Sequence, residues 1–191
     1  MALSHCKTFV ELREILLKDR PDELLAISSK GTVPVLQLHN NVVLDESLDI
    51  MIWILEKHDS IWIKFNIDEQ KSMIHENDND FKYYLDHYKY SERYPDCSKD
   101  QYNEQCKKYL INYEKKLNNH SFLLNDEMQL VDVAIFPFIR QYANVDKEDF
   151  ILTFPNLNNY LNKFCESNLF ISVMNKYSVW NKNSEPLIIN F

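Results

Sequence analysis

The stretch KGTVPVL (residues 30–36), followed by VLDESLDI (residues 43–50), decides the fold of this chain. The first part is an apolar, strand-like segment that contains a proline, and the second places Asp-Glu-Ser directly before a helical pattern. A proline lacks the N–H that a central strand needs, so it is confined to a sheet edge or a cis turn. We therefore predict a cis Val33–Pro34 bond within a strand, turn and helix.

The polar groups of this unit suit a peptide-like ligand. Beside the proline, the backbone N–H and C=O of Val33 can pair with an extended peptide. The Ser47 hydroxyl and the first N–H groups of the following helix suit a carboxylate, and Glu46 suits an ammonium group. These preferences fit γ-glutamyl-cysteinyl-glycine, the tripeptide glutathione. The alternative is that Glu46 and Ser47 merely cap a helix in some other α/β domain.

Two halves of different texture surround this unit. In the first half, residues 9–17 (FVELREILL) are typical of a buried strand, Arg20-Pro21-Asp22 opens a short helix, and residues 33–38 and 42–44 predict a hairpin. After about Trp62 the pattern is helical, with helices predicted at 78–90, 99–118, 130–142, 155–166 and 169–177. The fold class is therefore a small α/β unit followed by an all-α unit.

Composition limits the function classes. The 191 residues carry a formal charge of −8, which disfavours nucleic acid and anionic membranes as partners. The four cysteines form no C-x-x-C pair and read as reduced cytoplasmic thiols. We expect no metal site, because the pair His5-Cys6 has no second pair and Asn77–Asp80 lacks the glycine of a calcium loop.

The motifs KGTVPVL and VLDESLDI resemble the thioredoxin-like N-terminal domain of the glutathione S-transferase family. LVDVAIFPFIRQYANVD (residues 130–146) resembles a core helix of its all-α C-terminal domain, and FKYYLDHYKYSERYP (residues 81–95) is similar to an omega-like bacterial branch. The resemblance implies domains at 1–60 and 75–191, joined by a linker at 61–74.

The same resemblance implies a function and a site. Glutathione would be the co-substrate of a thiol transfer or conjugation, with an electrophilic or disulfide second substrate and a homodimeric, cytoplasmic enzyme. The family's contacts carry over to Arg20 for the glycyl carboxylate, Val33 for the cysteinyl backbone, and Glu46 with Ser47 for the γ-glutamyl group. Some of the tyrosines at 83, 84, 88, 90 and 94 line the family's second-substrate pocket or simply pack between helices.

One departure from the family concerns catalysis. The family begins with a strand and a Cys-Pro motif at a helix N-terminus, and by spacing this segment falls before Met1. We therefore expect no catalytic residue in the chain as written, and Cys6 at the far end of that helix is a poor substitute. We also expect residues 9–17 to be unpaired, displaced or exposed beside a remnant sheet of at most three strands. The alternative to an enzyme is a non-catalytic binding module or a truncated gene product.

Two residues at the start of the predicted helix 130–142 should affect its stability. Asp132 lies among apolar residues, so it should be buried and should accept backbone N–H groups at the start of the helix. Gln129 stands where the family has a capping serine, so half of the capping box should be missing.

Overall fold

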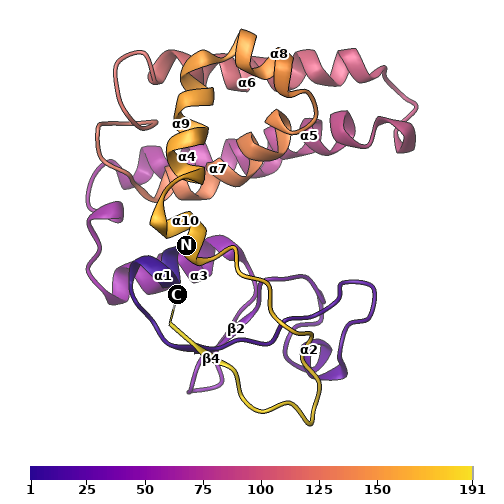
Figure 1. Cartoon of the computed structure of the whole chain (residues 1–191), viewed down its shortest axis with the longest axis vertical. Coiled ribbons are helices and arrows are strands. Elements are labelled where there is room, and N and C mark those ends of the chain that lie inside the picture. Colours follow the sequence, from indigo (N-terminus) through magenta and orange to yellow (C-terminus); the bar gives the residue numbers. More distant parts are fainter. Residues whose placement is uncertain (191) are drawn as a thin grey trace. The chain divides into compact units, whose positions relative to one another are not determined.

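The computed structural model describes residues 1–190, which form two compact units (Figure 1). The first unit consists of Met1–Ser60 together with the segment from Asn168 onward, and the second is Ile61–Ser167. The sequence did not predict that the C-terminal segment belongs with the N-terminal unit. None of the helices in residues 1–190 combines the length and the hydrophobicity that a membrane span requires.

The helices of the first unit enclose a small apolar core. They are α1 (Ala2–His5), α2 (Asp22–Ile27), α3 (Ser47–Lys57) and α10 (Asn168–Ser172). Helix α1 packs on α3, where Ile54 and Leu55 are fully buried. The Cys6 thiol at the end of α1 donates to the Ile54 carbonyl oxygen over 3.7 Å. This contact fixes the position of Cys6 inside the unit.

The strands of this unit form two separate antiparallel ladders of two residues each. Strand β1 (Val10–Glu11) pairs with β4 (Ile188–Ile189), and β2 (Leu36–Gln37) pairs with β3 (Val43–Leu44). The predicted hairpin is confirmed in the second ladder, although both of its strands are shorter than expected. Its turn contains Asn41 with a positive φ of 63°, a conformation that asparagine tolerates better than most residues.

The prediction of a buried strand over residues 9–17 is wrong in extent. Only Val10 and Glu11 belong to a ladder, and the Phe9 and Leu17 side chains are 69% and 59% exposed. The chain reverses locally through a bridge between Leu16 and Asp19 instead of continuing as a strand. Among residues 1–190 this segment has only β4 as a ladder neighbour, and the side chains of Phe9, Leu16 and Leu17 lie at the surface, as the expectation of a displaced, exposed segment required.

The second unit is helical throughout its regular structure. Its helices are η1 (Ile61–Ile63), α4 (Ile67–Glu76), η2 (Asn77–Phe81), α5 (Lys82–Lys89), η3 (Ser91–Arg93), α6 (Lys99–Lys116), α7 (Leu130–Ala143), α8 (Lys147–Thr153) and α9 (Pro155–Cys165). The segment η2 is a π-helical turn that joins α4 to α5 without a break. Residues 61–74, expected as a linker, contain η1 and most of α4. The sequence did not predict α8.

Helix α7 lies at the centre of the second unit, where most of its side chains are buried. The rings of Phe136 and Phe164 stack with centroids 4.6 Å apart. Asp132 is fully buried, and its carboxylate accepts the N–H groups of Gln129 and Leu123 over 2.8 and 2.9 Å. The prediction for Asp132 is confirmed. The expected half of the capping box is also missing, because the Gln129 side-chain oxygen is buried without a hydrogen-bond partner.

Burial raises the pKa of Asp132 to about 6, against the opposing effect of its backbone hydrogen bonds. The Tyr160 hydroxyl adds a third donor over 3.3 Å. Desolvation of the carboxylate therefore outweighs three hydrogen bonds that favour its charged form.

Candidate functional site

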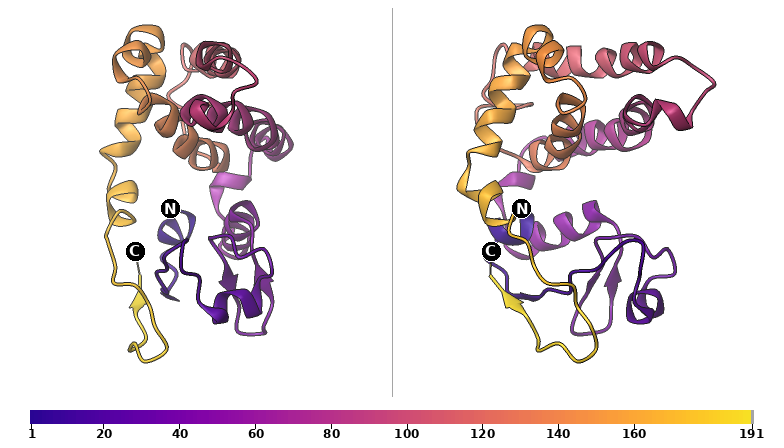
Figure 2. Two further views of the ribbon diagram at one scale, coloured as in Figure 1. Left: turned by 90° about the vertical axis from the view of Figure 1, so that its right-hand side faces the viewer. Right: turned by 45° about the vertical axis from the view of Figure 1, so that its right-hand side comes forward.

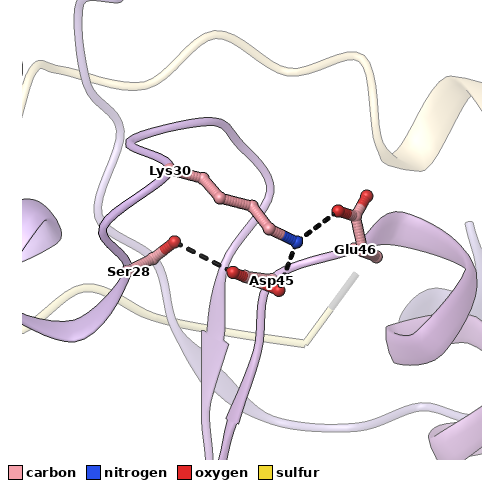
Figure 3. A network of polar contacts seen from close by, with 4 residues as sticks. All are labelled: Ser28, Lys30, Asp45 and Glu46. Carbon is pink, nitrogen blue, oxygen red and sulfur yellow. Dashed lines mark hydrogen bonds and ion pairs between the residues drawn. The ribbon is translucent and has the colours of Figure 1, made fainter.

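The candidate site lies where the loop 28–34 meets the start of α3. Figure 3 shows the polar network that joins them, which consists of Ser28, Lys30, Asp45 and Glu46. The Lys30 ammonium contacts a Glu46 carboxylate oxygen at 2.6 Å and an Asp45 carboxylate oxygen at 3.2 Å. The Ser28 hydroxyl donates to the other Asp45 oxygen over 3.1 Å. The network thus holds the loop against the two residues that precede α3.

The charges of this network perturb one another. The pKa of Lys30 is raised, chiefly by its hydrogen bond to Glu46, and the pKa of Asp45 is lowered, chiefly by its hydrogen bond from Lys30. The Glu46 side chain is 60% exposed and that of Lys30 is 50% exposed. Ion pairs this exposed add little to stability, so a ligand can exchange with their partners at little energetic cost.

Gly31 allows the loop to take its shape. Its φ is +59°, in the left-handed region, where a side chain would be strained. A Cβ atom at this position would lie 3.0 Å from the Leu25 side chain and 3.4 Å from the Cδ atom of Arg20. The single glycine of the chain therefore lets the Arg20 side chain lie directly against the loop.

Arg20 and Val33 both have polar groups that the rest of the chain does not use. Within residues 1–190 the Arg20 guanidinium makes no ion pair or hydrogen bond, and the Val33 backbone N–H and C=O make no hydrogen bond. The Val33–Pro34 bond is cis, which confirms the prediction. The Val33 side chain is 45% exposed. Both residues are thus accessible to a ligand.

Glu46 and Ser47 mark the start of α3. Glu46 precedes the first helical residue, Ser47, and no side chain caps the first N–H groups of this helix. These N–H groups point away from the helix with a partial positive charge, which suits a carboxylate. Three of the four predicted residues border the loop 28–34: Arg20 lies against Gly31, Val33 is a member and Glu46 pairs with Lys30, while Ser47 follows Glu46 as the first residue of α3. No hydrogen bond links any of the four to another.

Sequence reasoning missed three members of the polar network. The motifs that indicate the fold contain Lys30 and Asp45 but predict no role for either, and they do not include Ser28. Lys30 lies 15 residues before Asp45 in the chain, so no local signal in the sequence indicated their ion pair. The distance along the chain between Ser28 and Asp45 likewise gave no such signal.

Two of the four cysteines are unsuited to thiolate chemistry. Burial raises the pKa of Cys6, and it raises the pKa of Cys106 to about 12. Cys6 was predicted to be a poor nucleophile because of its place at the end of a helix. The structure supports the conclusion but gives burial as the main cause.

The tyrosines of α5 pack mainly within the second unit. The ring of Tyr84 lies 5.3 Å from that of Tyr83 and 6.2 Å from that of Tyr109. A shallow groove of about 470 Å³ is lined by Tyr84, Cys97, Asp100, Gln101, Tyr102, Glu104 and Gln105. Only Tyr84 of the five tyrosines considered lines this groove, and a second-substrate role for it stays a prediction.

Solved structures resemble this chain in fold at low sequence identity. A glutathione transferase family member from Pseudomonas fluorescens, solved with two glutathione molecules bound, superposes with a TM-score of 0.76 at 18% identity. The match covers 90% of this chain and 84% of that one. A glutathione transferase from Phanerochaete chrysosporium in complex with oxidised glutathione gives a TM-score of 0.77 at 18% identity, over 90% and 86% of the two chains. A search of curated proteins found no match.

Family sequence models cover most of the chain. The glutathione S-transferase N-terminal domain matches residues 1–62, and the glutathione S-transferase C-terminal domain matches residues 76–168. The two matches occur in the order that the family requires, and the first contains the whole polar network. Together with the fold, they show that this chain belongs to the glutathione S-transferase family.

Proposed function

We propose that this chain binds glutathione at the loop 28–34 and the start of α3, and that the bound thiol reacts with an electrophilic or disulfide substrate. In this proposal Arg20 binds the glycyl carboxylate and the Val33 backbone pairs with the cysteinyl residue. Glu46 binds the γ-glutamyl ammonium group, and Ser47 with the first N–H groups of α3 binds its carboxylate. Family membership and the glutathione bound to similar structures support the assignment.

The observation that carries the proposal is the order of unused polar groups around one loop. An unpaired guanidinium, an unpaired backbone peptide group and an uncapped helix start follow one another: Arg20, Val33 and Ser47. The ends of glutathione carry two carboxylates, and its middle carries a peptide backbone. Each unused group therefore has a chemical counterpart in the ligand.

Lys30 modulates this site. Its ammonium contacts Glu46 at 2.6 Å, and the γ-glutamyl ammonium of the ligand seeks the same carboxylate. The network leaves the second oxygen of the Glu46 carboxylate unused. The lysine and the ligand can therefore bind the same carboxylate, but each ammonium group weakens the contact of the other. Lys30 thus opposes the ammonium end of glutathione while it holds the loop in place.

The reaction follows from the nature of the bound thiol. Its thiolate forms a bond to an electrophilic carbon or to one sulfur of a disulfide, and the leaving group departs with the electron pair. The thiol proton passes to solvent. The chain's contribution in this proposal is binding and orientation of the tripeptide, because the buried thiols of Cys6 and Cys106 have raised pKa values.

Calorimetric titration with reduced glutathione tests the binding site. Glu46→Gln and Ser47→Ala should each lower the affinity about 10- to 150-fold, since a hydrogen bond to a charged group contributes about 1.5–3 kcal/mol. Glu56→Gln is the matched control, because Glu56 is exposed at the far end of the same helix. Failure of the wild-type chain to bind glutathione, or equal losses in control and site variants, would refute the proposed site.

Turnover is tested separately with a small disulfide or an activated aryl halide. Steady release of product that depends on glutathione and on Glu46 supports the enzymatic proposal. Binding without turnover supports the alternative of a non-catalytic binding module.

A further inference from the structure

The C-terminal segment 173–190 runs back along the first unit, as the yellow trace in Figures 1 and 2 shows. It is held at two points to the segment that follows β1. The Leu12 N–H donates to the Leu187 carbonyl oxygen over 2.8 Å, and the Trp180 N–H donates to the Glu14 carbonyl oxygen over 2.8 Å. The C-terminal segment is thus bonded along its length to the chain that leads to Arg20.

A tight turn fixes the part of this segment nearest to α2. The Ser184 N–H donates to the Asn181 carbonyl oxygen over 2.9 Å, and the Asn181 side-chain oxygen accepts the Asn183 N–H over 3.0 Å. Lys182 lies within this turn, and its ammonium pairs with Glu23 on α2 at 2.8 Å. On the other side the Arg13 guanidinium lies over the Trp180 ring at 4.8 Å. Arg13 therefore holds the Trp180 ring, and Glu23 holds the Lys182 ammonium group.

These residues line an open cavity that reaches Arg20. The cavity has a volume of about 360 Å³, and its lining comes from two distant parts of the chain: Ile15, Asp19, Arg20, Pro21, Asp22 and Glu23, and Val179, Trp180, Asn181 and Lys182. Two of the lining residues are cationic. Lys182 is paired with Glu23, whereas Arg20 has no partner within the described residues.

We propose that the C-terminal segment forms the outer wall of the glycyl subsite for glutathione, with Lys182 as a second cation beside Arg20 and Trp180 as an apolar cover. The inference rests on the proposed function, because it concerns how the glycyl end of the same ligand is bound. Lys182 is therefore a specificity-determining residue that distinguishes glutathione from peptides without the terminal glycine.

The balance of charge sets the class of ligand. Two cations face the three carboxylates of Asp19, Asp22 and Glu23 in the lining, so the cavity has a formal charge of −1 and holds an anion only through direct contact with both cations. It suits a single carboxylate that bridges Arg20 and Lys182, and it disfavours a dianion such as phosphate. Glu23 competes with the ligand for the Lys182 ammonium, which limits the gain in affinity from this contact.

The experiment compares glutathione with γ-glutamylcysteine, which has the same head and lacks only the glycine. The wild-type chain should bind glutathione more tightly, and Lys182→Met should lower the affinity for glutathione about three- to tenfold without changing that for γ-glutamylcysteine. Lys182→Arg should retain the preference, because it keeps the charge. Lys176→Met is the matched control in the same segment, since Lys176 is exposed and outside the cavity lining.

The two failures are distinguishable. If Lys182→Met leaves both affinities unchanged, or lowers both equally, the proposal that the C-terminal segment forms the glycyl subsite is refuted. The proposal that the chain binds glutathione is not affected by that result. If the wild-type chain binds neither thiol peptide, the proposed function fails and this inference fails with it. A circular dichroism spectrum of each variant shows whether a loss of affinity comes from a loss of folding.

Discussion

At the scale of single residues, Asp132 gives the sharpest test of the fold. Its carboxylate holds the N–H groups of Gln129 and Leu123 in the core of the second unit. Asp132→Ala leaves both donors buried without an acceptor, so the free energy of unfolding should fall by about 1–3 kcal/mol at neutral pH. Chemical denaturation measures this change, with the exposed Asp96→Ala as control. An unchanged midpoint would contradict the structural role of Asp132.

The same residue predicts a pH dependence. Its pKa is raised from 3.8 to about 6 in the folded chain, so between these values the folded state binds more protons than the unfolded state. The contribution of Asp132 to stability is therefore largest below pH 4 and declines as the pH rises to about 6. The difference in unfolding free energy between wild type and Asp132→Ala should widen by up to about 3 kcal/mol on acidification. A difference in unfolding free energy that becomes smaller as the pH falls from 6 to 4 would contradict this prediction.

Lys30 separates binding from stability. Since its ion pairs with Asp45 and Glu46 are exposed, Lys30→Met should leave the thermal midpoint almost unchanged. It should nevertheless raise the affinity for glutathione, because the ligand's ammonium group no longer competes for Glu46. Titration of the variant beside Lys71→Met, a control in α4, measures the effect. Weaker binding by Lys30→Met would show that the lysine serves the site only by holding the loop.

At the scale of elements, the start of α7 is open to improvement. Its capping box is incomplete, because the Gln129 oxygen is buried without a partner while Asp132 accepts the Gln129 N–H. A serine at this position can accept the N–H of residue 132, so Gln129→Ser should be more stable than Gln129→Ala by about 0.5–2 kcal/mol. The alanine variant removes the unpaired oxygen without adding a cap. The difference in the free energy of unfolding between the two variants therefore measures the contribution of the cap alone. Equal denaturation curves would contradict it.

Local patterns predicted the elements that depend on local chemistry. The hairpin around Asn40 and Asn41, the helix that begins at Ser47 and the core helix α7 all follow from turn residues or from helical spacing of apolar residues. The site residues followed from the same motifs. Arg20 was placed only through the family resemblance, because nothing local shows that Gly31 brings it to the loop.

Elements that depend on distant partners could not be predicted. Residues 9–17 have the composition of a strand, but the extent of a strand is set by its neighbours, and here the neighbour is Ile188–Ile189. The prediction of a helix over 169–177 fails for the same reason. Helix α10 ends at Ser172, and the residues beyond it extend toward β4 and the segment after β1. Helix α8 was missed because seven residues with two acids in the first turn give little periodicity.

At the scale of the whole molecule, the two units differ in the size of their cores. Among the largest fully buried side chains of the described chain, only Ile54 and Leu55 belong to the first unit. The amide hydrogens of α7 and α9 should therefore exchange with solvent far more slowly than those of Leu12 and Leu38, which bond across the short ladders. Hydrogen exchange followed by NMR or mass spectrometry measures this. Equal protection in both units would contradict the difference.

Other whole-molecule properties stay predictions. The resemblance to the family implies a homodimer and a cytoplasmic location, and sedimentation of the purified chain tests the first. The surface of the first unit includes the exposed side chains of Phe9 and Leu17, so the association state should be measured over a range of concentrations.

The pairing of β1 with β4 has a consequence for the order of events during synthesis on the ribosome. Val10 and Glu11 are translated long before their ladder partners, Ile188 and Ile189. The helices of residues 61–167 contain their own core and can fold while translation continues. The first ladder, and the Trp180–Lys182 wall with it, can form only after Ile189 has been translated and has left the ribosome. Until then Val10 and Glu11 lack their ladder partners.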